Sequence, residues 1–388
     1  MTISARSFGL HINKATSFSS PQTPWHDVGQ RSVRLWDTST RWRNLEPTKG
    51  AFEFGLLDEY VSSAVANNCH ILLTLGQPPA WATGGEATDE TYNANPPDSD
   101  TDWTDYIEAV VARMPAGTAY EIWNEPDLTA FYVGTKARLA ELHILAHDAI
   151  KAIDPTATIV SASVSRDVGY LHGYLSLVSD HTDVVGVHGY VYPVSPSATV
   201  QRIKWARAVA RRHGLAAAPV WDTEAAWHSF YDEGVLNNGP ASSSITAYDD
   251  ASCMPQALAA AYVARWLVAN EVGGADRSYW YGLDYWWNAV RMVTDLSSPS
   301  TLTDAALAHR YWAGFLAGST ISRFRQVPPL YSVDWSKNGA SGRIYWCRDD
   351  ATQNVDLSGF SSGVDVLGAA ITLTASYSVT HSPVIVTR

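Results

Sequence analysis

Two glutamates of the sequence stand where an apolar run gives way to a polar turn. Glu125 ends the run 120–124, and Glu224 ends the run 220–223. A carboxylate is costly to bury, so a glutamate at the mouth of two separate strands calls for a chemical reason. Cleavage of a glycosidic bond uses such a pair, because one carboxyl group protonates the leaving oxygen while the other attacks the sugar or activates a water. Either residue alone could be a loop cap or half of an ion pair, but the pair favours glycosidic chemistry.

The elements that would position these glutamates alternate regularly along the chain. Strands are expected at 8–14, 32–37, 70–76, 119–124, 158–163, 184–190, 220–223 and 278–286, and helical patterns at 55–67, 102–113, 136–153, 170–179, 199–213, 255–270 and 304–317. Strict alternation, interpreted as eight strand–helix pairs, favours a parallel sheet. Eight is also the number of strands that closes a (β/α)8 TIM barrel, whose strand-to-helix loops form the catalytic face.

An open, doubly wound sheet is the structural alternative. Such a sheet usually has a glycine-rich loop after its first strand. Here residues 11–14 read His-Ile-Asn-Lys instead, which favours the barrel.

The last part of the chain has a different sequence pattern. Residues 327–388 lack helical periodicity and contain short β-rich runs separated by turns such as Asn338-Gly339. We therefore expect a catalytic barrel at 1–320 and a small β-sandwich-type appendage at 321–388, packed on the barrel. Two long connections, 82–101 and 228–250, follow the third and seventh strands, on the catalytic face of such a barrel.

Composition excludes several classes of partner. The formal net charge of −12 would repel phosphate backbones, so no nucleic acid is expected. The three cysteines are far apart and give neither a disulfide framework nor a zinc site, and no metal or cofactor is expected. No stretch reaches the ~18 apolar residues of a membrane span. The segment after Met1 is polar and shows no signal peptide; a secreted or periplasmic location is favoured if one was removed, and a cytoplasmic one otherwise.

The sequence around the two glutamates resembles a known group of enzymes. Asn124-Glu125-Pro126 together with Glu224 resembles clan A glycoside hydrolases, and further motifs resemble family 39 within that clan. These motifs are Arg34-Leu35-Trp36-Asp37, Trp42, residues 45–50 and 57–58 after the second strand, residues 75–82 after the third, and Val187-His188-Gly189-Tyr190 at the sixth. The resemblance covers the barrel, about four fifths of the chain, and the sequence at Glu224 departs from the common xylosidase pattern.

The resemblance implies a retaining mechanism with Glu125 as general acid/base and Glu224 as nucleophile. Asn124 would hydrogen-bond the sugar 2-hydroxyl. Arg34 would pair with Glu224 and keep it ionised, the alternative being an ion pair with another acid inside the barrel. Tyr190 could orient Glu224 and His188 could contact sugar, with structural packing an equal alternative for each.

Two further expectations concern Glu125. Pro126 should hold the backbone at Glu125 extended. The charge of Glu224 and an apolar wall should raise the pKa of Glu125 toward the operating pH.

Aromatic residues suggest where sugar rings would stack. The chain has 16 Trp and 19 Tyr against 9 Phe, and both types combine an apolar face with a polar group. Candidates for the sugar-stacking floor are Trp81, Trp123, Trp286 and Trp287, of which we expect two to bind sugar and two to pack. Tyr231 lies near the start of the long loop after strand seven, and Phe131 and Tyr132 follow the acid/base strand. Rings on separate loops suit several subsites, which favours an endo-acting enzyme on a poly- or oligosaccharide.

Other interpretations remain open at this point. They are an exo-acting glycosidase (xylosidase- or arabinosidase-like), an inverting enzyme, a metal-dependent hydrolase on the same fold, and a non-catalytic sugar-binding barrel. No His-x-His or His-x-x-x-His stands at a strand end, which disfavours a metal site. A binding barrel would be expected to lose one of the two carboxylates. Sugar identity and oligomeric state have no signal in the sequence.

Overall fold

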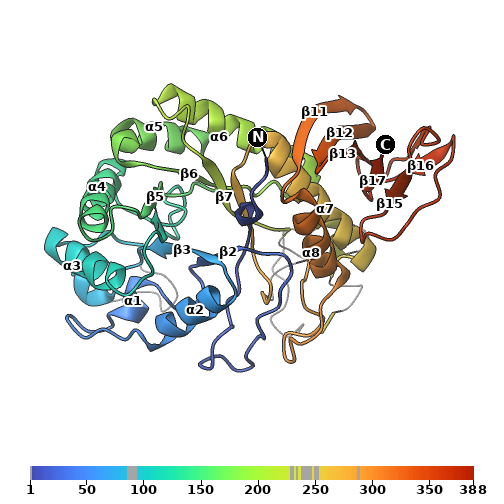
Figure 1. Cartoon of the computed structure of the whole chain (residues 1–388). Helices are drawn as coiled ribbons and strands as arrows, with labels where there is room; N and C mark the ends of the chain where they lie inside the picture. Colours follow the sequence, from blue (N-terminus) through green and yellow to red (C-terminus); the bar gives the residue numbers. More distant parts are fainter. Residues whose placement is uncertain are drawn as a thin grey trace.

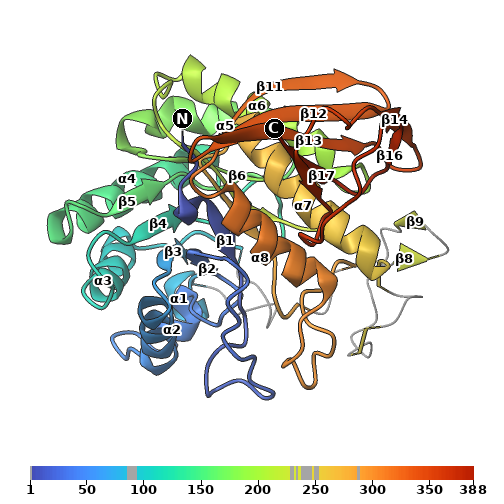
Figure 2. The same ribbon diagram turned by 45° about the vertical axis from the view of Figure 1, so that its right-hand side comes forward.

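The protein is a parallel barrel that carries an antiparallel sheet on one side (Figures 1 and 2). The computed structural model describes residues 2–84, 94–227, 231–232, 235–236, 247–248, 253–285 and 289–388. The barrel strands are β1 (Phe8–Leu10), β2 (Ser32–Leu35), β3 (His70–Leu75), β4 (Ala119–Ile122), β5 (Thr158–Val160), β6 (Val185–His188), β7 (Val220–Ala225) and β10 (Arg277–Trp280). Their order in the sheet is β5-β4-β3-β2-β1-β10-β7-β6, and a parallel bridge between Val160 and Val184 joins the two ends. The predicted (β/α)8 barrel is confirmed.

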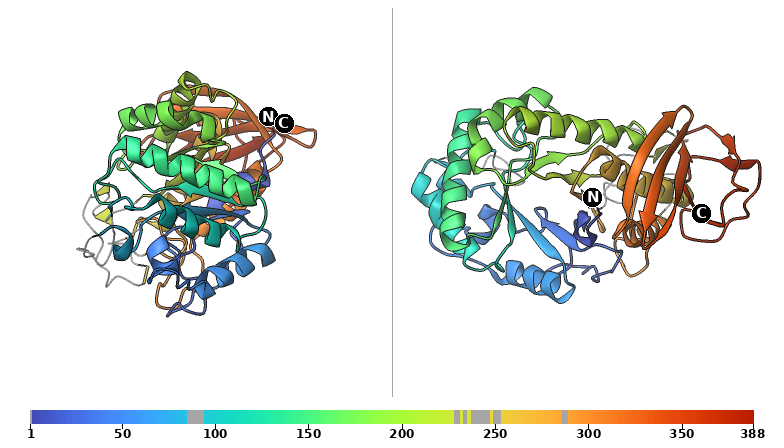
Figure 3. Two further views of the ribbon diagram at one scale, coloured as in Figure 1. Left: turned by 90° about the vertical axis from the view of Figure 1, so that its left-hand side faces the viewer. Right: turned by 45° about the horizontal axis from the view of Figure 1, so that its top comes forward.

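Helices surround the barrel (Figure 3). They are α1 (Trp42–Leu45), α2 (Gly55–Ala66), α3 (Asp100–Val111), α4 (Lys136–Ile153), α5 (Val168–Val178), α6 (Thr199–Arg212), α7 (Gln256–Gly273) and α8 (Asp304–Leu316), with short 3-10 turns η1 (Ala5–Ser7), η2 (Ala80–Ala82), η3 (Ser179–His181) and η4 (Pro196–Ala198). Side-chain caps at Ser99, Thr135 and Asp167 fix the starts of α3, α4 and α5 by accepting backbone N–H groups. No helix in the described part of the chain is long and apolar enough to cross a membrane.

The structure corrects the predicted alternation at two places. The connection between β1 and β2, residues 11–31, contains no helix, so eight strand–helix pairs are one too many. Pro21 and Pro24 interrupt this segment, and proline breaks a helix interior. The eighth strand ends at Trp280 and not at 286, because the chain then bends across the barrel mouth, where Leu283 N donates to His11 O at 2.8 Å.

The barrel interior has an apolar layer and a polar one. Near the amino ends of the strands, six buried side chains form a cluster: Leu72, Ala119, Val160, Val184, Trp221 and Tyr279. The ring of Tyr279 lies across β1, where a Cβ on Gly9 would come within 2.3 Å of it. Farther along the strands, the interior carries Arg34, Thr74 and Glu121, all fully buried. The sequence therefore places its charged groups at the carboxyl ends of the strands, where catalytic sites of such barrels lie.

The C-terminal residues form antiparallel sheets. One contains β11 (Thr320–Val327), β12 (Leu330–Lys337), β13 (Ala340–Cys347), β17 (Val384–Thr387) and β15 (Ser362–Val364); β14 (Gln353–Val355) pairs with β16 (Tyr377–Val379). A further short pair, β8 (Tyr231–Asp232) with β9 (Val235–Leu236), lies in the connection after β7.

Helices α7 and α8 bind the C-terminal part of the chain (Figure 2). The fully buried Arg265 of α7 donates to Asp349 at 2.6 Å. Trp312 of α8 donates to Val366 O at 2.9 Å, and Phe315 packs edge-on against Trp335. These contacts bury a charged group and large aromatic rings, so neither surface is suited to exposure to water.

We propose from these contacts that the C-terminal sheet is structural and not a separate sugar-binding module. A chain that stops at Gln326 would leave β11 without β12 and would expose Trp312 and Arg265. This variant should be insoluble or melt at a much lower temperature than the full chain, measured by soluble yield and thermal unfolding in parallel preparations. A soluble, fully active truncated barrel would show the proposal to be wrong.

Candidate active site

The side chains predicted to do chemistry meet at the carboxyl ends of β2, β4, β6 and β7. One carboxylate oxygen each of Glu125 and Glu224 and one ring nitrogen of His188 all lie within 4.8 Å of one another. Glu125 and Glu224 are each only 7% exposed, and His188 is fully buried. The structure thus brings together residues that are 36 to 99 positions apart in sequence.

Glu224 is held on both of its oxygens. Arg34 Nη1 donates to Oε2 at 2.6 Å, and the Tyr190 hydroxyl donates to Oε1 at 2.6 Å. Two such donors fix the plane of the carboxylate and stabilise its charged form. The contacts that the sequence suggested for Arg34 and Tyr190 are both present in this structure.

Arg34 has a second acidic partner that sequence reasoning did not name. Its Nε donates to Glu121 Oε2 at 2.9 Å, and its Nη2 donates to Asn124 Oδ1 at 2.7 Å. Glu121 is fully buried and also accepts from Thr74 at 2.7 Å and from Ser163 at 2.5 Å. Both predicted alternatives for Arg34 therefore occur together. The sequence feature that could have identified this second partner of Arg34 is Glu121 itself, an acid within an otherwise apolar strand.

Glu125 has His188 as its partner. His188 Nδ1 lies 2.8 Å from Glu125 Oε1, and Nε2 lies 3.8 Å from Glu224 Oε2. The imidazole therefore stands between the two carboxylates. The sequence offered a sugar contact or structural packing for His188; the structure places this fully buried ring against the two acids.

The backbone at Glu125 is not extended, which corrects the expectation drawn from Pro126. Glu125 has φ +42° and Trp123 has φ +82°, both in the left-handed region. The strand ends at Ile122, and Glu125 N then donates to Ser163 O at 3.0 Å on the neighbouring segment. This bond turns the chain toward β5. Such strained positions are often found at functional sites.

The pKa directions in the substrate-free site also differ from expectation. Burial alone would raise the pKa of Glu125, but the hydrogen bond and charge of His188 outweigh it and lower that pKa. Burial raises the pKa of Glu224, and the charges of His188 and Arg34 offset this only in part. Arg34 therefore does not bring the pKa of Glu224 below its usual value, which differs from the expectation that Arg34 keeps this residue ionised. Burial would lower the pKa of His188, but the charges of Glu224 and Glu125 raise it above its usual value.

These directions favour the protonated form of His188. Its ring would then donate from Nδ1 to Glu125. The same charges oppose metal binding by this trio, because a cation would face Arg34, which lies 2.6 Å from Glu224. The arrangement is suited to proton transfer next to a held carboxylate.

The predicted stacking residues are only partly found at the site. Trp123 is fully buried, donates to Phe131 O at 2.9 Å and packs against Trp103 and Tyr132, so it is one of the candidates that pack. The left-handed turn explains this, because it takes Trp123 off the regular alternation of the strand. Tyr132 is also buried, with 3% of its surface exposed.

Trp81 remains half-buried on η2, after β3. Its ring donates to Glu46 O at 3.1 Å and packs edge-on against Trp42. Tyr231 begins β8, but its side chain lies outside the described residues, as do Trp286 and Trp287 entirely.

Asp222 is a buried acid that the sequence analysis did not single out. Its Oδ1 accepts from Gly189 N–H at 2.8 Å, directly after His188. A Cβ on Gly189 would lie 2.2 Å from Oδ2, so this close approach requires glycine. The contact fixes the chain between His188 and Tyr190, where the pairing of β6 with β7 is irregular. Burial raises the pKa of Asp222 to about 7.

Comparison with solved structures identifies proteins of similar fold. A family 39 glycoside hydrolase from the gut symbiont Bacteroides cellulosilyticus WH2 matches with a TM-score of 0.74 and 16% identity, over 100% of this chain and 82% of that one. The fold is that of clan A glycoside hydrolases. A family 39 β-xylosidase from Caulobacter crescentus matches with a TM-score of 0.67 and 15% identity, over 100% and 97% of the two chains.

A family 30 endoxylanase from Clostridium papyrosolvens C71 is also similar, with a TM-score of 0.63, 14% identity and coverage of 100% and 96%. At these identities the likeness establishes the fold alone. No family model matches the sequence, and no curated protein sequence matches it.

The raised pKa of Asp222 predicts a pH-dependent stability. The folded protein keeps this proton up to about pH 7, whereas the unfolded chain releases it near pH ~4. The folded state therefore binds more protons in this window, and stability must fall as pH rises through it. The free energy of unfolding should therefore fall by an amount on the order of 3 kcal/mol between pH ~4 and ~7 because of Asp222, and Asp222→Asn should remove this fall. Urea unfolding at a series of pH values measures it.

Asp105→Asn, a change at an exposed position of α3, is the matched control and should keep the wild-type slope. An Asp222→Asn protein whose stability falls with pH as steeply as that of the wild type would contradict the prediction.

Proposed function

We propose that this protein is a retaining glycoside hydrolase that cleaves β-type glycosidic bonds of a poly- or oligosaccharide by double displacement. The observation that carries the proposal is the carboxylate pair, whose nearest oxygens lie within 4.8 Å. Retaining enzymes have their carboxyl groups ~5–5.5 Å apart, whereas inverting enzymes need ~6.5–9.5 Å to admit a water. The fold shared with glycoside hydrolases agrees with this chemistry.

Glu224 is the proposed nucleophile. Arg34 and Tyr190 hold its two oxygens, so the attacking carboxylate has a fixed direction before substrate arrives. Such preorganisation lowers the cost of reaching the transition state. Substrate binding would also bring the developing positive charge of the sugar ring against Glu224, which favours its ionised form.

Glu125 is the proposed general acid/base, and His188 is its proton source. Transfer of the Nδ1 proton over the 2.8 Å contact gives a protonated Glu125 and a neutral imidazole. Glu125 then protonates the leaving oxygen and later removes a proton from the attacking water. The oxygen of Asn124 accepts from Arg34, which leaves its amide nitrogen as the end that can donate to the sugar 2-hydroxyl.

We further propose that the enzyme cleaves bonds inside a polysaccharide chain. With Trp123 and Tyr132 buried, this proposal rests on the half-buried rings of Trp81 and Phe131, which lie on separate loops at the catalytic face. Rings on two loops suit two sugar subsites. An exo-acting xylosidase- or arabinosidase-like enzyme is the alternative, and a non-catalytic sugar-binding barrel would have no use for the carboxylate pair.

Glu224→Gln should lower turnover on the order of 10³-fold or more, because an amide cannot form the glycosyl ester. Turnover would be measured on a panel of aryl β-glycosides, with circular dichroism to check the fold. Glu141→Gln, at an exposed position of α4, should leave turnover unchanged. A folded Glu224→Gln protein that keeps more than a small percentage of wild-type activity would refute the assignment.

Glu125→Ala should slow substrates with poor leaving groups by about 10²- to 10⁴-fold, since these need a proton on the departing oxygen. Dinitrophenyl glycosides, whose leaving groups need little protonation, should lose far less in the first step. The ratio of kcat/KM between the two classes is the measurement. Equal losses on both classes would exclude Glu125 as the acid.

Product size tests the endo-acting prediction. Early digestion of a β-linked polysaccharide should give oligosaccharides and a fast fall in viscosity. Monosaccharide as the sole product from the first minutes would show an exo-acting pocket enzyme.

A further inference from the structure

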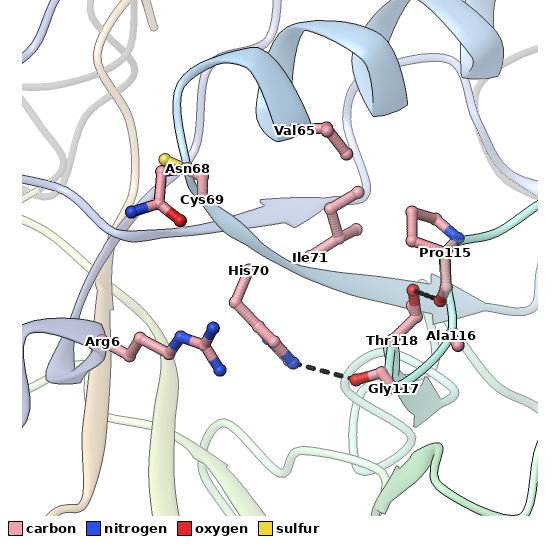
Figure 4. A pocket seen from close by; sticks show the side chains of 10 residues that line it. All are labelled: Arg6, Val65, Asn68, Cys69, His70, Ile71, Pro115, Ala116, Gly117 and Thr118. Atoms are coloured by element: carbon pink, nitrogen blue, oxygen red, sulfur yellow. Dashed lines mark hydrogen bonds between the residues drawn. The ribbon is translucent and has the colours of Figure 1, made fainter.

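A second hollow lies on the amino-terminal face of the barrel, away from the carboxylate pair (Figure 4). It has a volume of about 200 Å³ and is formed by residues 68–71 at the start of β3, residues 115–118 before β4, Val65 of α2 and Arg6 of η1. None of these residues takes part in the proposed catalysis. The inference drawn from this hollow is therefore independent of the proposed function.

One side of the pocket carries positive charge without a matching acid. The Arg6 guanidinium points toward the His70 ring (Figure 4), and Arg277 Nη1 donates to His70 Nδ1 at 2.8 Å. Among the described residues, no carboxylate forms an ion pair with Arg6 or Arg277. Two acids lie close by, but Asp154 accepts from Gly117 N–H at 2.7 Å and Asp27 pairs with Arg31 at 3.0 Å.

The other ionisable groups of the pocket are neutral. His70 donates from Nε2 to Gly117 O at 3.0 Å and accepts from Arg277, so both ring nitrogens are used. Burial lowers the pKa of His70 to about 4, and the charges of Arg277 and Arg6 contribute. Burial also raises the pKa of the Cys69 thiol to about 11. In a chain of net charge −12, Arg6 and Arg277 thus form a local region of positive charge beside the pocket.

The opposite side of the pocket is apolar. Val65 is 59% exposed at its rim, and Ile71, Pro115 and Ala116 continue this surface. An inorganic anion has no apolar surface that could pack against these side chains. About 200 Å³ corresponds to roughly six or seven times the ~30 Å³ of one water, which is space for a small organic molecule and less than drug-sized ligands need.

We propose that this pocket binds a small organic carboxylate. The carboxylate pairs with the guanidinium fork of Arg6, a geometry in which two parallel N–H···O bonds form. The alkyl body lies against Val65, Pro115 and Ala116. Neutral His70 lines the pocket, and Arg277, which donates to His70 Nδ1, adds positive charge next to it.

The test uses the full chain and sodium pentanoate as the probe, at constant ionic strength, with binding followed by isothermal titration calorimetry. Pentanamide has the same shape without the charge and should bind at least about tenfold more weakly. Inorganic phosphate has the charge without the alkyl body and should also bind more weakly. Equal or tighter binding of either would overturn the proposed ligand class.

Variants locate the binding. Arg6→Gln, at an exposed side chain, should weaken pentanoate binding about tenfold, whereas Arg211→Gln at an exposed position of α6 should change nothing. Ala116→Glu should abolish binding by placing a negatively charged, larger side chain in the lining of the pocket. Absence of saturable binding to the wild type, or binding that both pocket variants retain, would contradict the proposal.

Discussion

The buried guanidinium of Arg34 is the interaction on which the candidate site depends. It is fully buried and donates to Glu121, Asn124 and Glu224, so that one cation joins β2, the end of β4 and β7. A charge in a protein interior is stable only when paired and hydrogen-bonded, and removing one partner of such a pair typically costs 3–5 kcal/mol. The acids in turn need Arg34, because three carboxylates in one buried layer would otherwise repel one another. The charges of Glu121 and Glu224 accordingly raise the pKa of Arg34.

The remaining structure can be understood as support for this polar layer. Below it, apolar side chains from Leu72 to Tyr279 close the barrel interior and exclude water from the amino end. Beside it, the titratable ring of His188 lies between Glu125 and Glu224, while Asp222 fixes the backbone that carries His188 and Tyr190. The layer therefore combines one permanent charge with one that can give up its proton. This difference allows two chemically identical carboxyl groups to have different roles.

The sequence predicted the barrel because its signals are local and repeated. Apolar runs and helical periodicities follow one another, and the helix 136–153 was predicted with the bounds that α4 has in the structure. The absence of a helix between the first two strands was not recognised from the sequence. The interpretation as eight strand–helix pairs counted residues 11–31, with their two prolines, as one more unit of the repeat. The change of sequence pattern near the C-terminus is equally local, and it corresponds to the antiparallel sheets after α8.

The site was predictable to a smaller extent. Glu125 and Glu224 were evident as acids at strand ends, and Arg34 and Tyr190 were associated with Glu224. The partnership of His188 with Glu125 and that of Glu121 with Arg34 depend on distances across the barrel, which no spacing in the sequence encodes. Which of the four tryptophan candidates pack could not be told from the sequence, because the direction of Trp123 depends on a left-handed backbone at the end of β4. The pKa directions failed for a related reason, since they depend on burial and on the position of His188 between the two acids.

The central claim is that Glu224 forms a bond to the sugar while Glu125 moves the proton. Peptide mass spectrometry after incubation with a 2-deoxy-2-fluoro aryl β-glycoside tests this directly. The fluorine slows both steps by destabilising the charged transition state, and the activated leaving group keeps the first step faster, so a covalent intermediate accumulates. The structure predicts one glycosyl group on the peptide that contains Glu224, attached at that residue. Attachment at Glu125, or complete absence of label in an enzyme that turns over the parent aryl glycoside, would contradict this account.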